Sequence, residues 1–233
     1  MIGVAFMDSI SWYGKFKAVT EDLIPVDLLR YCLWSITFND KAHDLNHVYH
    51  VCKQGNDLAL LQDYDDHWRS LVLAGCLLHD IGCRYDRKTH HLIAYGLVFD
   101  LTHRYCTGHY SPEETLIIAK SCLEHRASWE GDFSHPISET VALADRGIPD
   151  FELYCKRAVQ FRLDQNLTED VLVEEVRVHM LDKFLPKTGY VWKNYPELGL
   201  SLYEQEWKVF HDKLKDEVVF REAVLEAYRK LKS

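Results

Sequence analysis

Apolar residues recur every three to four positions along most of this chain, which is the spacing of one face of an α-helix. The helices that this pattern predicts cover residues 26–38, 43–62, 66–79, 89–105, 111–125, 150–163, 168–184 and 199–231, and another begins near Pro136. The helix over 43–62 is expected to loosen near Gly55. Few stretches alternate apolar and polar residues with the period of a strand, so the predicted fold class is all-α.

Two helix boundaries have clear signals. Ser111, Pro112 and Glu114 supply an N-cap, a proline in the first turn and a glutamate at the third helical position. Gly82 is expected to stop the helix that runs over 66–79. These signals fix where His79 and His125 fall, because both lie at the predicted carboxyl ends of helices.

Composition narrows the functional class. The chain has 233 residues, which is enough for one large domain or two small ones, and 47% of them are hydrophobic, so it can bury a sizeable core. The 36 acidic and 27 basic residues give a formal net charge of −9, which argues against a broad basic surface for nucleic acid. An anionic small molecule is still compatible with this charge, because a metal ion reverses the local field.

The seven cysteines form no CxxC pair, and such scattered cysteines are typical of a reducing compartment. The first ten residues lack the basic start of a signal peptide and contain Asp8. No window approaches the ~20 apolar residues that span a bilayer. We therefore expect a cytoplasmic protein without membrane contact, and we leave its oligomeric state open.

The dipeptide His79-Asp80 closes the apolar run 71–82 and is the first candidate for chemistry. Burying an imidazole or a carboxylate without a partner costs several kcal/mol, and a divalent metal ion would satisfy both groups at once. Neighbouring helical residues point about 100° apart, so both reach one ion only where the helix end lies against the site. The second oxygen of Asp80 would allow this residue to bridge two ions. The ordinary alternative is that Asp80 caps a turn.

Other histidines and a second aspartate complete an ordered series. His43, His47 and His50 are spaced to share one helix face. Asp145 lies in the apolar run 141–145, where the alternative to a metal is a salt bridge to an arginine. The remaining members of the series are His90, His91 and His125. Imidazoles and carboxylates suit iron, manganese, zinc, nickel or magnesium, so the expected cofactor is one or two divalent ions.

The order and local context of these residues resemble the HD superfamily of metal-dependent phosphohydrolases. The matching text is His43-Asp44-Leu45-Asn46-His47-Val48-Tyr49-His50-Val51, Leu77-Leu78-His79-Asp80-Ile81-Gly82 and Ala144-Asp145. The resemblance implies an HD-domain-like helical bundle over about 40–150 with a C-terminal helical extension over about 150–233, together forming one domain over 1–233. It implies that one metal is held by His47, His79, Asp80 and Asp145.

In branches of this superfamily that hold two metals, two more histidines take part. His125 resembles one of them, and His90 or His91 the other. We favour His90, because Ala94 supplies a small residue four positions further on, while His91 stays open. The sequence departs from the family at His50, where many relatives carry arginine.

The implied function is hydrolysis of a phosphate ester of a small substrate, most naturally a nucleotide, by a metal-activated water. Asp80 and His125 are the expected catalytic residues, with His50 as a speculative general acid. The expected phosphate-binding residues are Arg84, Lys120, Arg126 and Arg146. The alternatives are a non-catalytic metal- or nucleotide-binding module and a di-iron oxygenase. Residues 187–195 are either a substrate-facing loop or packing.

Overall fold

The computed structural model describes residues 2–232, with side chains from residue 10 onward, and within that range it contains only helices. The predicted all-α class is confirmed. Contacts between residues divide the chain into two compact units. The first ends at Gly147 and the second begins at Ile148. This boundary lies close to residue 150, where the predicted core gives way to the predicted extension.

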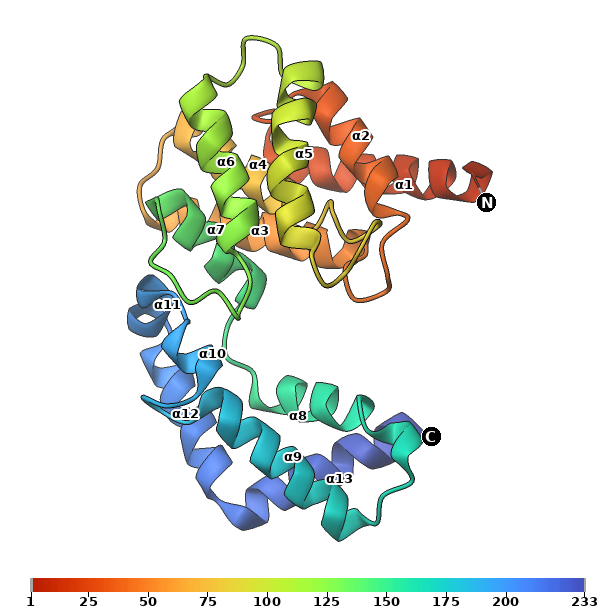
Figure 1. Ribbon diagram of the computed structural model, residues 1–233, viewed down its shortest axis with the longest axis vertical. Helices are drawn as coiled ribbons and strands as arrows, with labels where there is room; N and C mark the ends of the chain where they lie inside the picture. Colours follow the sequence, from red (N-terminus) through yellow and green to blue (C-terminus); the bar gives the residue numbers. More distant parts are fainter. Residues whose placement is uncertain (1, 233) are drawn as a thin grey trace. The chain divides into compact units, whose positions relative to one another are not determined.

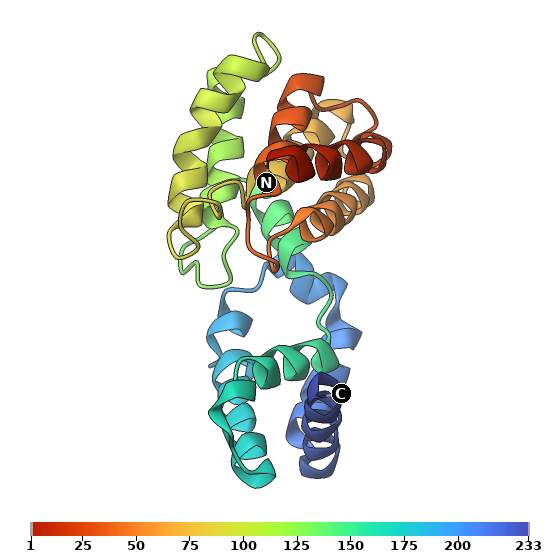
Figure 2. The same cartoon turned by 90° about the vertical axis from the view of Figure 1, so that its right-hand side faces the viewer.

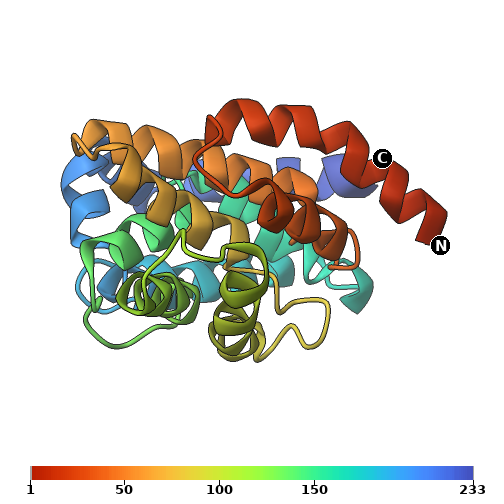
Figure 3. The same ribbon diagram turned by 90° about the horizontal axis from the view of Figure 1, so that it is seen from above.

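The first unit contains seven helices. They are α1 (Ile2–Thr20), α2 (Val26–Ile36), α3 (Leu45–Leu61), α4 (Asp66–Leu78), α5 (His90–Tyr105), α6 (Pro112–Glu124) and α7 (Pro136–Arg146). In Figure 1, α5 and α6 lie side by side, and Figure 2 shows α1, α2 and α3 gathered on the other side of this unit. Seen from above in Figure 3, α1 runs along the outside of the unit.

Helix α4 is the centre of the first unit. Every residue from Arg69 to Leu78 is buried, and α4 is in contact with α3, α6 and α7. The apolar run that the sequence placed before His79 is therefore a helix surrounded on all sides, which explains why it has no polar stripe. His79 and Asp80 follow at the carboxyl end of this buried helix and therefore lie in the interior of the unit.

The predicted loosening of the second helix near Gly55 is wrong. Helix α3 is continuous through this position, where Gly55 is buried. A Cβ at Gly55 would meet Cys76 Sγ and Val72 Cγ1 of α4, so the glycine is needed for close packing of the two helices. Helix α3 also begins two residues later than predicted, because Asp44 caps it by accepting from the backbone N–H of His47. His43 therefore precedes the helix and does not share its face with His47 and His50.

The second unit contains elements of very different lengths. They are α8 (Phe151–Gln160), the 3₁₀ turn η1 (Leu163–Gln165), α9 (Glu169–Phe184), α10 (Tyr190–Lys193), α11 (Glu197–Leu202), α12 (Glu204–Lys215) and α13 (Glu217–Lys232). The single helix predicted over 199–231 is wrong, because the chain breaks at Tyr203 and Asp216. The backbone of Asp216 is extended, and its carboxylate accepts from the N–H groups of Val218 and Val219, which starts α13.

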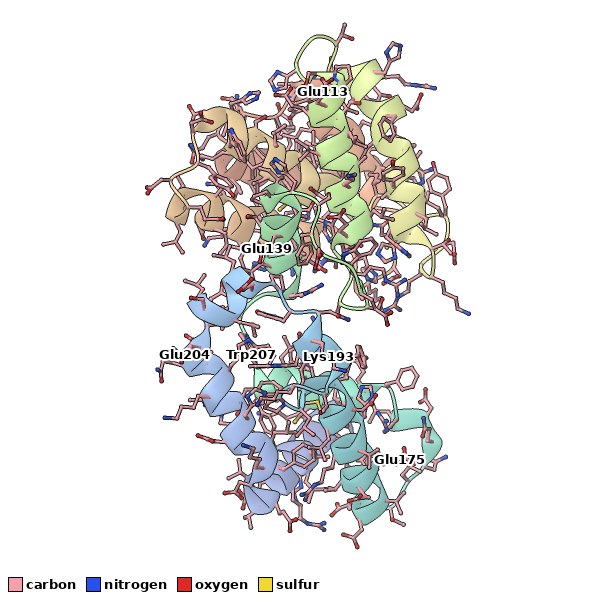
Figure 4. All side chains as sticks on the ribbon, turned by 60° about the vertical axis from the view of Figure 1, so that its left-hand side comes forward. Glu113, Glu139, Glu175, Lys193, Glu204 and Trp207 are labelled. Carbon is pink, nitrogen blue, oxygen red and sulfur yellow. The ribbon has the colours of Figure 1, made fainter. Side chains whose placement is uncertain are left out.

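Aromatic side chains fill the second unit, where α8 packs against both α9 and α13 (Figure 1). Trp207, labelled in Figure 4, is buried, and the ring of Phe210 lies 5.3 Å from it. The ring of Trp192 lies 4.9 Å from Trp207, and the ring of Tyr195 lies at the same distance. These contacts favour packing as the role of Trp192 and Tyr195 in the stretch 187–195, whereas Tyr190 is exposed. None of the helices in residues 2–232 combines the length and the apolarity needed to cross a membrane.

Candidate metal centre

The end of α4 places an imidazole and a carboxylate side by side in the interior. The helix ends at Leu78, and His79 is its C-cap residue. His79 and Asp80 have exposed fractions of 0% and 2%, so both side chains are removed from bulk water. Neighbouring helical residues point about 100° apart, so His79 and Asp80 can reach one place only at the end of the helix. The end of α4 meets this condition.

One oxygen of Asp80 faces the first group of ligands. Its Oδ2 lies 3.0 Å from His79 Nε2 and 3.3 Å from His47 Nε2, and those two nitrogens are 3.3 Å apart. Asp145 on α7 adds a second carboxylate, with Oδ1 3.3 Å from His47 Nε2 and 3.8 Å from His79 Nε2. Helices α3, α4 and α7 therefore converge on one position.

The other oxygen of Asp80 faces a second group. Its Oδ1 lies 3.2 Å from His90 Nε2 and 3.7 Å from His125 Nε2. These two nitrogens are 3.1 Å apart. Since each oxygen of one carboxylate faces a different group, Asp80 links the two groups of imidazoles.

Hydrogen bonds at the far side of the rings fix which nitrogen faces the site. Nδ1 of His79, of His90 and of His125 each lies 2.7 Å from a backbone carbonyl oxygen, that of Cys76, Arg87 and Cys122 respectively. A carbonyl only accepts, so each Nδ1 carries a proton and donates it. The same arrangement, in which the outer ring nitrogen donates to a carbonyl, is common for histidines that bind metals.

This arrangement fits a metal ion. In their neutral forms, His90 and His125 present bare lone pairs on nitrogens 3.1 Å apart, and the carboxylate of Asp80 faces both. Asp80 Oδ2 is buried, with His79 Nε2 and His47 Nε2 as its close neighbours at 3.0 and 3.3 Å. Converging lone pairs repel one another unless a cation lies between them. These buried groups could hold a metal ion in two sets of three, His47 with His79 and Asp80, and Asp80 with His90 and His125.

The electrostatics differ between the two groups when no metal is bound. Burial disfavours a charged imidazole, but Asp145 and Asp80 outweigh it and raise the pKa of His47 to about 10. Burial, reinforced by the charge of His79, lowers the pKa of His125 to about 3. Burial likewise lowers the pKa of His90. The first group therefore holds a proton at neutral pH, and the second group does not.

The two carboxyl groups respond to these histidines. Burial alone would raise the pKa of Asp80, but the neighbouring His79 and His47 hold it well below its usual value. Burial opposes ionisation of Asp145 as well, and His47 again outweighs it and lowers the pKa of Asp145. Both carboxylates are thus ionised at neutral pH, as metal ligands must be.

Two predicted histidines lie outside these groups. His91 is the neighbour of His90, but its Nδ1 lies 3.5 Å from Arg126 Nη1, and it belongs to neither set of three. The geometry therefore favours His90 over His91 as the ligand. His50 is exposed on α3, and its ring lies 5.7 Å from the ring of Tyr49.

The four predicted phosphate-binding cations have different surroundings. Arg126 donates to the carbonyl of Lys88, two residues before His90, and Arg146 donates to the carbonyl of Arg126, the residue after His125. Arg84 donates to Ser35 Oγ and lies over the rings of three aromatic residues, Trp34, Phe38 and Tyr85. Lys120 is half-buried on α6.

The structure brings two further residues to the site. One ligand atom each of His43 and Cys83 lies within 4.8 Å of Asp80 and of the other. The stripe of His43, His47 and His50 indicated a ligand site, but His43 was not among the expected ligands, and Cys83 had no expected role. The signal for Cys83 was its position three residues after Asp80, since the turn after α4 brings them together.

Comparison with protein-family models, with curated proteins and with solved structures found no match for this chain.

Proposed function

We propose that this protein is a metal-dependent phosphohydrolase that cleaves a phosphate ester of a small substrate, with nucleotides as the preferred class. The proposal rests on the donor set around Asp80 and on the resemblance of the motifs around His47, His79 and Asp145 to the HD superfamily. Imidazole and carboxylate ligands are the donors with which metal-dependent hydrolases hold their ions.

One observation carries the proposal most strongly. The Nδ1 protons of His90 and His125 are committed to carbonyl oxygens, so in the neutral rings no proton is left to separate the two Nε2 atoms, which lie 3.1 Å apart. Asp80 Oδ1 faces both nitrogens and accepts from the thiol of Cys83 over 3.6 Å. A purely structural cluster would place a donor between the two nitrogens, because leaving buried polar atoms unpaired costs about 1–3 kcal/mol each. A cation satisfies both nitrogens and the carboxylate.

The roles of the residues follow from the two groups. His47, His79, Asp80 and Asp145 would hold one ion, and Asp80, His90 and His125 the other. Divalent ions bound here would lower the pKa of a coordinated water toward ~7 and offset charge on the phosphate. Arg126 and Arg146 lie directly after two of the ligands, where guanidinium groups would orient phosphate oxygens. The role of His50 as a general acid stays a prediction.

The test combines metal analysis with a hydrolysis screen. The protein would be loaded in turn with Mn²⁺, Fe²⁺, Zn²⁺ and Mg²⁺ and then assayed against generic phosphomonoesters and phosphodiesters and a panel of nucleotides. We expect Asp80→Ala to lose both ions and the hydrolysis. We expect His90→Ala to lose one ion. His103→Ala is the matched control, because His103 is an exposed histidine on the same helix as His90.

Each outcome has a distinct meaning. Asp80→Ala protein that keeps its metal and its hydrolysis would show that the site is assigned wrongly. Native protein that binds ions but cleaves no ester would contradict the hydrolase and favour a binding module. Oxygen consumption by the iron-loaded protein, without ester cleavage, would favour an oxygenase instead.

A further inference from the structure

A third set of potential metal ligands lies beside the two groups just described. One ligand atom each from His43, Asp80 and Cys83 lies within 4.8 Å of the other two. The thiol of Cys83 donates to Asp80 Oδ1 over 3.6 Å. Asp80 and Cys83 are buried and His43 is half-buried, so the set is largely shielded from water.

His43 is oriented in the way that metal-binding histidines are. Its Nδ1 lies 2.9 Å from both carboxylate oxygens of Asp40, which therefore accepts the Nδ1 proton. This hydrogen bond leaves the lone pair on Nε2 for a ligand. Asp40 is itself held by the backbone N–H of Ala42 at 2.8 Å. A carboxylate that orients an imidazole from behind is a typical outer partner of a metal site.

The ring of His43 faces the interior cluster rather than solvent alone. Its centre lies 6.0 Å from the ring of His47 and 5.9 Å from the ring of His90. A hydrogen-bonded pair of His43 and Asp40 at the surface would form without the rings of His47 and His90 beside it. The position of the ring between two candidate ligands therefore points to a role at the site.

Asn39 ties the segment before α3 to the segment after α4. Its Nδ2 donates to the backbone carbonyls of His43 and Asp80, over 3.0 and 3.1 Å. Its Oδ1 is buried and accepts no hydrogen bond from the described residues. Asn39 thus fixes the segments that carry His43 and Cys83 to one another. Its Oδ1 is a buried acceptor between these segments.

We propose that His43, Asp80 and Cys83 form a binding position for a thiophilic divalent cation, with zinc as the leading candidate. Thiolate sulfur favours zinc over magnesium or manganese, whereas the two groups of imidazoles and carboxylates have no sulfur. Three protein ligands with one open position make a common zinc arrangement. When the ion binds, the Sγ–H bond of Cys83 breaks, the sulfur bonds to the ion and the proton leaves to solvent.

This position competes with the second group for one oxygen. Asp80 Oδ1 accepts from Cys83 and also faces His90 Nε2 at 3.2 Å. An ion held by Cys83 would therefore withdraw Asp80 Oδ1 from His90 and His125. The expected consequence is that zinc at this position weakens binding of manganese at the second group. The inference shares Asp80 with the proposed hydrolase but does not depend on hydrolysis.

Cobalt provides a direct readout of the sulfur ligand. Co²⁺ substitutes for zinc, and a cobalt–thiolate bond gives a charge-transfer absorption in the near ultraviolet that imidazole and carboxylate ligands do not give. The native full-length chain titrated with Co²⁺ should show this band. Cys83→Ser should lose the band while still binding cobalt at the histidines. Added Zn²⁺ should abolish the band, and added Mg²⁺ should not.

Two further variants control the experiment. Cys106→Ser changes another buried cysteine at the opposite end of α5 from His90 and should keep the band. Asp40→Asn keeps all three ligands but weakens the hydrogen bond that orients His43. The affinity for cobalt, followed by the intensity of the band, should fall about 10–100-fold. Circular dichroism would verify that each variant is folded, and serine at position 83 retains a donor for Asp80.

Three results would overturn the inference. They are native protein that shows no charge-transfer band at saturating cobalt, a band that persists in Cys83→Ser, and a band that disappears equally in Cys106→Ser. Failure of the hydrolase proposal is distinguishable, because protein that cleaves no ester and still shows the Cys83-dependent band contradicts only the hydrolase.

Discussion

A methyl group at Gly82 would collide with the backbone that carries His90. Gly82 lies in the turn after α4, two residues beyond Asp80. A Cβ built on Gly82 overlaps the carbonyl oxygen of His90 and lies 3.0 Å from its Cα and carbonyl carbon. Ordinary contacts begin at 3.4 Å, so Gly82→Ala forces one of the two segments to retreat by about 1 Å.

The size of this shift decides its effect on metal binding. Metal–ligand distances tolerate about 0.2 Å, so a movement of about 1 Å is several times too large for His90 to keep its place. Overpacking of this kind costs about 1–3 kcal/mol of folding free energy. We therefore expect Gly82→Ala protein to fold with reduced stability and to lose the ion held by His90 and His125. The ion held by His47, His79 and Asp145 should stay, since His47 and Asp145 lie on α3 and α7 and His79 is held by its hydrogen bond to the carbonyl of Cys76 within α4.

The assay is the number of Mn²⁺ ions bound per chain, measured by titration calorimetry and by metal analysis after dialysis. Gly96→Ala is the matched control, because Gly96 lies on α5 with His90 and a Cβ there meets nothing within 4 Å. It should keep the native stoichiometry and gain about 0.5–1 kcal/mol of stability as a helix-interior glycine. Folded Gly82→Ala protein with the native number of ions and native affinity would refute the assignment of His90.

Three other predictions concern stability. Mn²⁺ at 100 times its Kd should stabilise the native protein by about 2.7 kcal/mol, which raises Tm by about 5–10 °C in a scanning calorimeter, and Asp80→Ala should remove the shift. In the metal-free protein, the pKa of His47 is raised to about 10, so its stabilisation is present below pH 6.5 and is lost as pH rises toward 10. Urea unfolding should therefore show a smaller loss of stability between pH 7 and 10 in His47→Gln than in the native chain. Ser111→Ala breaks the capping box of α6 and should cost about 1 kcal/mol in urea unfolding, whereas an unchanged midpoint would show that the cap contributes nothing.

The sequence was a good guide to the helices of the first unit from α2 to α7, and α6 in particular has a clear signal at its start in its capping box. Helix α1 was not predicted, since its apolar residues are spread around the helix and not along one stripe. The break at Asp216 was missed for a different reason. The apolar period continues on both sides of it, and only the hydrogen bonds of its carboxylate to the following N–H groups separate α12 from α13.

The residues of the two groups could be listed from the sequence, but the nearness of His43 and Cys83 to them could not. A histidine next to an aspartate at the end of an apolar run led to His79 and Asp80, and a carboxylate within another apolar run led to Asp145. The nearness of His43 and Cys83 to Asp80 depends on how the loop before α3 packs against the turn after α4. Asn39 makes that contact through backbone carbonyls, which have no sequence signature.

The ends of two helices explain how the imidazoles are aimed. The last carbonyls of a helix lack partners within the helix and need donors from elsewhere. His79 and His125 are the C-cap residues of α4 and α6, and each donates its Nδ1 proton to the carbonyl three residues earlier. One hydrogen bond thus satisfies a helix end, fixes the tautomer and turns Nε2 toward Asp80. Because this bond is local, both rings keep their orientation before any ion arrives, and less ordering is left for metal binding to impose.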